Sequence, residues 1–436
     1  MRYDQGTKQR RRVAKLLLSA LLATSALAVT HANAAAADDP AWCQPDCGDL
    51  VSDWSLNAYA VMRAANGYAD PMAATRVLAT MHIAMHDAAN AGAARYATHT
   101  RISAPAADYD AAVATVVAAH DVLVGFFPDQ AAIVAAALEA SLLDAGVGAA
   151  VQAGRAVGAD AAAAILAERA TDGAEAREGW TEQEGVGHYR HVPGWDFLVS
   201  PQWRSVRPFA LASPDQFRTA PPPALASAEY AVEFAEVAAT GRDVSETRSA
   251  EETEYAAFWY EFSDIGWNRA TRVAAREHDL DLRDNARLFA LVNVAMADGY
   301  IAGWDSKMHH DFWRPVTAIA TADDDGNPGT TSIESWAPFL PTPPIQDHPS
   351  THSVLGAATA TVLAETLGDT GFAMTSTTAL GHAPWRSFEG FTDAAEENAE
   401  SRIHAGIHFR SAIDTGLDLG RKIGTHVLNN FLVPVN

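Results

Sequence analysis

Between residues 53 and about 172, apolar residues recur every three or four positions, as on one face of an α-helix. Leu78, Met81, Met85 and Ala89 are one example. The segment is also rich in alanine, the strongest helix former. Further helices are predicted at 111–127, 130–144 and 149–168. This part of the chain is therefore predicted to be a helical bundle.

The pattern breaks between residues 173 and 223, which contain Trp180, Trp195, Trp203 and Phe209 and end in three prolines. Long irregular segments of compact proteins are commonly functional or wrap around other elements. We interpret this one as the join between two helical regions.

Helical spacing resumes after residue 224. Helices are predicted at 225–240, 251–262 and 282–304, and Leu288, Val292, Ala295 and Gly299 form one stripe of the last. No stretch alternates convincingly between apolar and polar residues, as half-buried strands do. The predicted fold class is all-α, with an N-terminal helical region at 38–223 and a C-terminal helical region, which carries the candidate chemistry, at 224–436.

Residues 1–37 are typical of an export signal peptide. Lys8, Arg10, Arg11, Arg12 and Lys15 precede a short apolar run at 16–29, and Ala32-Asn33-Ala34 resembles a cleavage site. The run is too short for a membrane span. The paired arginines also fit a twin-arginine signal loosely. The protein is predicted to be exported, either to the periplasm or into the medium.

Composition limits the possible partners. The 436 residues are 48% hydrophobic and 19% charged, which is typical of a globular protein. Without residues 1–37, which hold six basic residues and one acid, the formal net charge moves from −23 to −28. Nucleic acid and anionic membranes are therefore poor partners. Cys43 and Cys47 are predicted to form a disulfide, and a two-ligand metal site is the alternative.

Two other polar clusters have structural and functional interpretations. His82, His86 and Asp87 could be metal ligands, but buried or surface side chains with ordinary partners are favoured. The acidic run 323–327 resembles the start of a calcium loop. Pro328 follows it and no glutamate occupies the twelfth position, so a solvated turn is favoured.

The most informative stretch is Asp347-His348-Pro349-Ser350-Thr351-His352-Ser353, followed by an apolar run. Proline, serine and threonine before such a run predict a helix start. Free backbone N–H groups and the positive end of the helix dipole favour an anion there. His352 is close enough to exchange a proton with that anion. The stretch therefore predicts an oxyanion site.

Two further stretches supply positive charge. Lys307 and Arg314 are seven residues apart, which on a continuous helix would place them on one face, with Pro315 ending or bending it. Arg402 follows Ser401, and His408 lies six residues beyond Arg402. Three cations, backbone donors and two imidazoles are what a tetrahedral oxyanion requires.

These motifs, Lys-x6-Arg-Pro, Pro-Ser-x-His and Ser-Arg-x5-His, resemble in order and spacing the signature of vanadium-dependent haloperoxidases and the related type 2 phosphatidic acid phosphatases. They span residues 307–408. The long upstream helical region and the context around Trp304 and Trp313 look more like the bacterial haloperoxidase branch. The resemblance implies an all-α fold with the site in the C-terminal bundle.

The resemblance also implies a role for each residue. His408 would bind vanadium, Lys307, Arg314 and Arg402 would neutralise the equatorial oxygens of vanadate, and His352 would be the acid–base residue. Ser350 would donate through its hydroxyl and Thr351 through its backbone N–H. Lys307 would also polarise hydrogen peroxide, which then oxidises a halide that reacts with a small organic acceptor. Asp298 and Asp305, two turns apart on one predicted helix, are expected to hold the arginines in place, with plain surface acids as the alternative.

The sequence departs from the family at Thr351, where the pattern has glycine. A β-branched residue would be strained there if φ must be positive. Two alternatives to a haloperoxidase stay open. One is an acid phosphatase in which His408 forms a phospho-enzyme from a phosphate ester and His352 protonates the leaving oxygen. The other is a helical binding protein with a degenerate site. Halide preference and oligomeric state are not readable from the sequence.

Overall fold

The computed structural model describes residues 50–435 except 93–94, 103–107, 144 and 382–383. The predicted signal peptide and the Cys43–Cys47 disulfide lie outside the described residues. The N-terminal helices are α2 (Leu50–Asn66), α3 (Pro71–Asn90), α4 (Ala111–Phe126), α5 (Ala131–Ser141) and α6 (Ala149–Arg169). The later ones are α7 (Ala228–Thr240), α8 (Ala250–Phe258), α9 (Ser263–Glu277), α10 (Leu282–His310), α11 (Pro315–Ala320), α12 (Thr351–Leu367), α13 (Phe391–His404) and α14 (Arg410–Asn430).

The all-α prediction is confirmed, with one small addition. Strands β1 (Phe372–Thr375) and β2 (Trp385–Phe388) pair in antiparallel register between α12 and α13. Each strand has only four residues, which is too short for an alternating pattern to stand out. Short 3-10 turns occur at Pro128–Gln130, Pro201–Ser205 and Ala322–Asp324.

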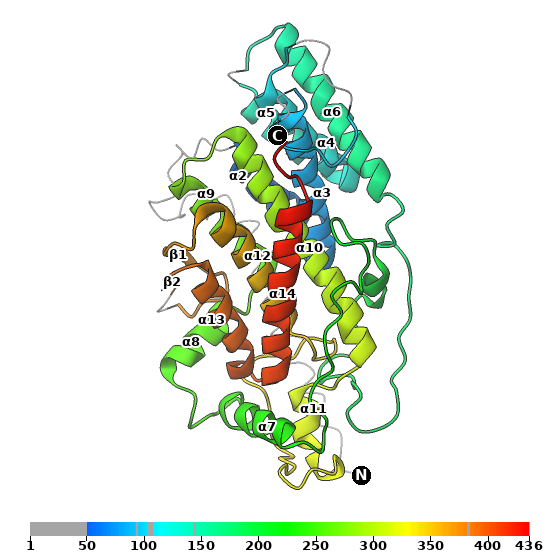
Figure 1. The fold of residues 1–436 in the computed structure, drawn as a ribbon, viewed down its shortest axis with the longest axis vertical. Coiled ribbons are helices and arrows are strands. Elements are labelled where there is room, and N and C mark those ends of the chain that lie inside the picture. The colour runs from blue at the N-terminus through cyan, green and yellow to red at the C-terminus, as the bar shows by residue number, and fades with distance from the viewer. Residues whose placement is uncertain (1–49, 93–94, 103–107, 144, 382–383, 436) are drawn as a thin grey trace.

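Helix α10 is the axis on which the two helical regions meet. It packs against α3 on one side and against α12 and α14 on another (Figure 1). Twenty-one of its side chains are buried, so its surface is apolar nearly all round rather than along one stripe. One continuous core joins residues of both regions. The boundary at 223 and 224 stays a prediction.

The segment between α6 and α7 is irregular, as predicted, and it wraps other elements. Its backbone bonds to the ends of the later helices: Tyr189 N donates to Asp311 O at 2.8 Å and Trp313 N donates to Gly187 O at 2.9 Å. Val199 N donates to Pro344 O at 2.9 Å. None of the described helices is both long and apolar enough to cross a bilayer.

In the cluster at 82–87, His86 and Asp87 have ordinary partners, while His82 is a buried ring packed against an aromatic side chain. His86 Nε2 lies 3.2 Å from Ala97 O, and the Asp87 carboxylate accepts from the backbone of His99 and Thr100. His82 is fully buried against Phe289, with 5.2 Å between ring centroids, and neither ring nitrogen has a hydrogen-bond partner. Burial lowers the pKa of His82 to about 3.

His82 predicts a loss of stability in acid. The unfolded chain takes up this proton near pH 6.5 and the folded chain only near pH 3, so stability falls as pH drops through that window. At one pKa unit per 1.36 kcal/mol, the loss reaches about 4–5 kcal/mol by pH 3. His82→Met should remove this part of the pH dependence in urea unfolding. An unchanged curve for His82→Met would contradict the prediction.

Candidate active site

Lys307 and Arg314 lie close together, but not for the reason predicted. Helix α10 ends at His310, and Asp311 adopts a left-handed conformation with φ of 49°. Arg314 then precedes α11, which starts at Pro315. The two cations therefore do not share one helix face, because the left-handed residue Asp311 ends α10 between them. Both side chains are 1% exposed.

Both cations bind carbonyl oxygens around the predicted oxyanion stretch. Lys307 Nζ donates to Gln346 O at 2.8 Å and to Asp347 O at 3.0 Å. Arg314 donates to Ile345 O at 2.7 Å and to Ile407 O at 2.6 Å. These bonds hold residues 345–347 and the turn before His408 against the end of α10.

The predicted helix start at Ser350 is confirmed. Ser350 caps α12, whose first residue is Thr351, and the Ser350 hydroxyl oxygen lies 3.5 Å from Ser353 N. This long contact leaves the Ser350 O–H free to donate. Thr351 does not have a positive φ, so the family's glycine is not required for the backbone at this position. Its N–H, at the first turn, has no carbonyl partner within the helix.

Arg402 and His408 are joined by a turn that needs glycine. Arg402 lies in the last turn of α13, and Gly406 follows with φ of 79°. A Cβ at Gly406 would collide with the Gly241 carbonyl oxygen. The turn directs His408 back toward Arg314, whose Nη1 lies 3.0 Å from His408 Nε2.

The two imidazoles are held by different acceptors. His408 Nδ1 lies 2.9 Å from an Asp347 carboxylate oxygen, and His352 Nε2 lies 3.1 Å from the Glu261 carbonyl. Burial lowers the pKa of both histidines well below the usual range. Arg314 and Lys307 lower the pKa of His408 further, and Arg402 that of His352. Both rings are therefore neutral near pH 7.

The predicted residues thus form one electrostatic unit. Arg402, Lys307 and Arg314 act on the pKa of both histidines, and His352 acts on that of His408. Burial also lowers the pKa of Lys307 well below its usual range, with a further contribution from Arg314. Five residues that span about a hundred positions of the chain lie within interaction range of one another.

Positive charge at this site exceeds negative charge. In the described part of the chain, Asp347 is the one carboxylate within 4 Å of the three cations, 3.9 Å from Arg314 Nη1. Burial raises the pKa of Asp347 to about 7, against the opposing effect of Arg314 and Lys307. The Nη2 atom of Arg402 is buried without a hydrogen-bond partner. Since unpaired buried charge is costly, the site is suited to a compact oxyanion such as vanadate or phosphate.

Asp298 and Asp305 lie on α10 as predicted, but they bind other partners than the site arginines. Asp298 accepts from the backbone N–H groups of Phe209, Ala210 and Leu211 at 2.7–2.9 Å. Asp305 forms two 2.7 Å bonds with Arg218. Both acids therefore attach the irregular segment to α10, which corrects the role we predicted for them.

The sequence offered no role for Asp347 or for Glu261. Asp347 begins the predicted oxyanion stretch, and that position could have suggested a role at the site. Its partner His408, however, lies about sixty residues further along the chain, so the contact itself could not be predicted. Glu261 acts through a backbone carbonyl, which any residue could provide. Its carboxylate pairs instead with Arg269, at 2.6 Å.

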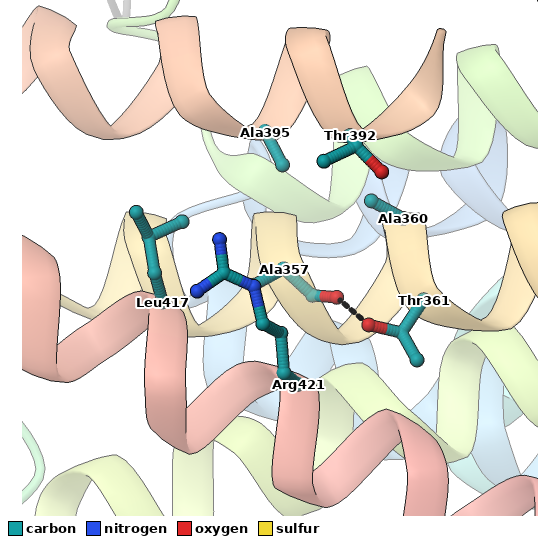
Figure 2. Close-up of a pocket in the computed structure, with 7 residues that line it drawn as sticks. All are labelled: Ala357, Ala360, Thr361, Thr392, Ala395, Leu417 and Arg421. Carbon is teal, nitrogen blue, oxygen red and sulfur yellow. Dashed lines mark hydrogen bonds between the residues drawn. The ribbon is translucent and has the colours of Figure 1, made fainter. Parts of the chain in front are cut away.

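A separate small cavity lies between α12, α13 and α14 (Figure 2). It has a volume of about 20 Å³, room for roughly one water molecule. It is lined by Ala357, Ala360, Thr361, Thr392, Ala395, Leu417 and Arg421. None of the predicted site residues lines it, so it is not part of the candidate active site.

Two sequence comparisons match parts of this chain. The family model described as the VCPO second helical-bundle domain matches residues 287–435. Vanadium chloroperoxidase of Curvularia inaequalis is 38% identical over 84 residues, which is 17% of this chain. That alignment spans only 13% of the relative's own length.

Solved structures extend the likeness to most of the chain. A crystal structure of the first bacterial vanadium-dependent iodoperoxidase superposes with a TM-score of 0.75 and 27% identity, covering 88% of this chain and 97% of the other. A holo-type bacterial vanadium-dependent chloroperoxidase superposes with a TM-score of 0.66 and 20% identity, covering 82% and 91%. The second likeness concerns the fold alone.

Proposed function

We propose that this chain, which is similar to vanadium-dependent haloperoxidases in its C-terminal sequence and in its fold, is an exported enzyme that uses vanadate and hydrogen peroxide to oxidise a halide. In the reaction, peroxide is reduced to water, the halide is oxidised to a hypohalous acid, and one proton is consumed. A small organic molecule is the final acceptor. The observation that carries the proposal is the group of three buried cations with a single carboxylate, facing two neutral imidazoles.

The residues divide the work by their chemistry. Lys307, Arg314 and Arg402 would neutralise the oxygens of vanadate, with charge-assisted hydrogen bonds of about 1.5–3 kcal/mol each. Ser350 and the N–H of Thr351 would donate to the same oxygens. His408, as a neutral imidazole, would offer a lone pair to the metal.

His352 is the residue proposed to transfer protons to and from hydrogen peroxide and the product. Its Nε2 faces the Glu261 carbonyl, so the ring keeps its proton there and has a lone pair on Nδ1. A base of this kind can take a proton from hydrogen peroxide and return it to the product. Bound vanadate would supply the electrophilic centre at which peroxide is activated.

An acid phosphatase is the second candidate. A neutral His408 beside a carboxylate is also what a nucleophilic imidazole requires, and the same cations would stabilise a transferring phosphoryl group. A binding protein with a degenerate site is less well supported. The only feature that suggested it was Thr351 in place of glycine, and the backbone at Thr351 does not have a positive φ, so threonine is not strained there.

A paired assay on one preparation separates these functions. Vanadate-loaded protein should halogenate a diketone in the presence of peroxide and either iodide or bromide, well above the rate with free vanadate. Iodide is included because the bacterial relative with 27% identity is an iodoperoxidase. Hydrolysis of an aryl phosphate by metal-free protein, without halogenation, would favour the phosphatase. Neither activity, with vanadate still retained, would favour the binding protein.

A further inference from the structure

Asp347 is a buried carboxylate beside the imidazole of His408. Its exposed fraction is 0%, and its Oδ1 lies 2.9 Å from His408 Nδ1. The adjoining backbone is fixed on both sides. Asp347 N donates to Phe312 O at 3.0 Å, and Lys307 Nζ donates to Asp347 O at 3.0 Å. The backbone is therefore fixed beside the ring, while both carboxylate oxygens are buried without a hydrogen bond in this structure, so the 2.9 Å approach to Nδ1 is a close contact with an acceptor that is still free to take a proton.

A guanidinium nitrogen lies near both ring nitrogens and is closer to Nε2. Arg314 Nη1 lies 3.0 Å from His408 Nε2 and 3.4 Å from Nδ1. A neutral imidazole has one N–H and one lone pair. With the proton on Nδ1, the N–H faces the carboxylate and the lone pair faces a donor. With the proton on Nε2, two donors face each other and a lone pair faces the carboxylate. Both neighbours favour the first tautomer.

We propose that Asp347 is a positioning residue, which accepts the Nδ1 proton of His408 and thereby keeps the lone pair on Nε2, where the central atom of the oxyanion would take the place of the contact with Arg314. The inference rests on the proposed function, in which His408 has that role. Groups that orient a metal-binding histidine in this way contribute about 10- to 100-fold to affinity.

If the Asp347 carboxylate only balanced the charge of the buried cations, its removal would change the affinity for vanadate in the opposite direction. Removing a negative charge makes the site more positive, so any anion should then bind more tightly. Positioning predicts that vanadate, which needs the imidazole, binds more weakly, while phosphate, held by the cations, does not. The two roles therefore differ in the sign of the effect on vanadate.

Three variants of the full chain test this difference. Asp347→Ala removes the acceptor, and Asp347→Asn keeps an amide oxygen that can accept the same proton. Asp87→Ala removes another buried carboxylate, which lies on α3 and contacts His99 and Thr100. By equilibrium dialysis, Asp347→Ala should weaken vanadate binding about 10- to 100-fold without weakening phosphate binding. Asp347→Asn should stay within a few-fold of wild type, and Asp87→Ala should leave both affinities unchanged.

The tautomer itself is open to measurement without vanadate. In ¹⁵N NMR of histidine-labelled protein, the His408 signals are identified by their loss in His408→Ala. Wild type should have the proton on Nδ1, and Asp347→Ala should lose this preference. Unchanged tautomer and unchanged or tighter vanadate binding in Asp347→Ala would overturn the inference alone. Wild type that retains no vanadate would overturn the proposed function, and the tautomer comparison would then decide the positioning role by itself.

Discussion

We expect His408→Ala to lose vanadate on gel filtration while the protein stays folded. The imidazole is the one group proposed to bind the metal itself, and its loss cannot be replaced by the cations, which reach only the oxygens. The affinity should fall by more than the roughly 100-fold that is the upper range for removing a group that merely orients a ligand. Metal analysis of the eluted protein, with a thermal unfolding curve as a check on folding, measures the effect.

His352→Ala is the matched comparison, because it removes the other neutral imidazole of the same site. It should retain vanadate and turn over about 100-fold or more slowly, the range for losing a general acid–base group. If His352→Ala loses vanadate and His408→Ala keeps it, the roles assigned to the two histidines are exchanged.

We expect Arg402→Met to separate stability from anion binding. The guanidinium is 1% exposed: its Nε donates to the Ser401 hydroxyl at 3.1 Å, its Cζ lies 5.8 Å from the centre of the Tyr260 ring, and its Nη2 has no hydrogen-bond partner among the described residues. Burial lowers its pKa to about 10. Without an anion, replacing such a charge by an apolar side chain of similar length should leave the unfolding free energy unchanged or raise it by about 1 kcal/mol. Losing a charge-assisted bond of about 1.5–3 kcal/mol should weaken phosphate or vanadate binding by roughly 10- to 150-fold.

Thermal unfolding with and without phosphate measures both effects, because a ligand of the folded state raises the midpoint in proportion to its affinity. Arg169→Met is the control. Arg169 is equally buried, but it bonds to Asp172 and to the carbonyls of Arg207 and Pro208. Its loss should destabilise the protein with or without the anion. If Arg402→Met behaves like Arg169→Met, and phosphate still stabilises it, Arg402 is a structural residue.

The helices were predictable because their patterns are local. The predicted spans at 111–127, 149–168 and 225–240 correspond to α4, α6 and α7 within three residues at each end. Helices α9, α11, α13 and α14 were not predicted, and α9 shows why. It carries four arginine and glutamate residues among its fifteen, and its burial depends on contacts with α10 and α12. When a helix has many charged residues, its buried face can be identified only from its neighbours in the folded protein.

Site residues were predictable as a set, but their arrangement was not. Lys307 and Arg314 belong together, although the helix that was to align them ends at His310. The end of α10 at Asp311 depends on a left-handed conformation that a single sequence does not reveal. Likewise, the spacing of Asp298 and Asp305 indicated one helix face but not the segment that covers it. Contacts between distant segments, as for Asp347 and His408, follow from the fold alone.

Helix α10 makes the C-terminal half dependent on the N-terminal half. Its first turns contact α3 through the Phe289 ring against His82 and through Arg283, which donates to Ala89 O. Its last turn carries Lys307. A fragment that begins at residue 224 would keep every proposed anion-binding residue. It would, however, expose to water the apolar surface of α10 around Phe289, and exposed apolar surface promotes aggregation. The catalytic region is therefore unsuited to expression by itself or to transfer into another scaffold.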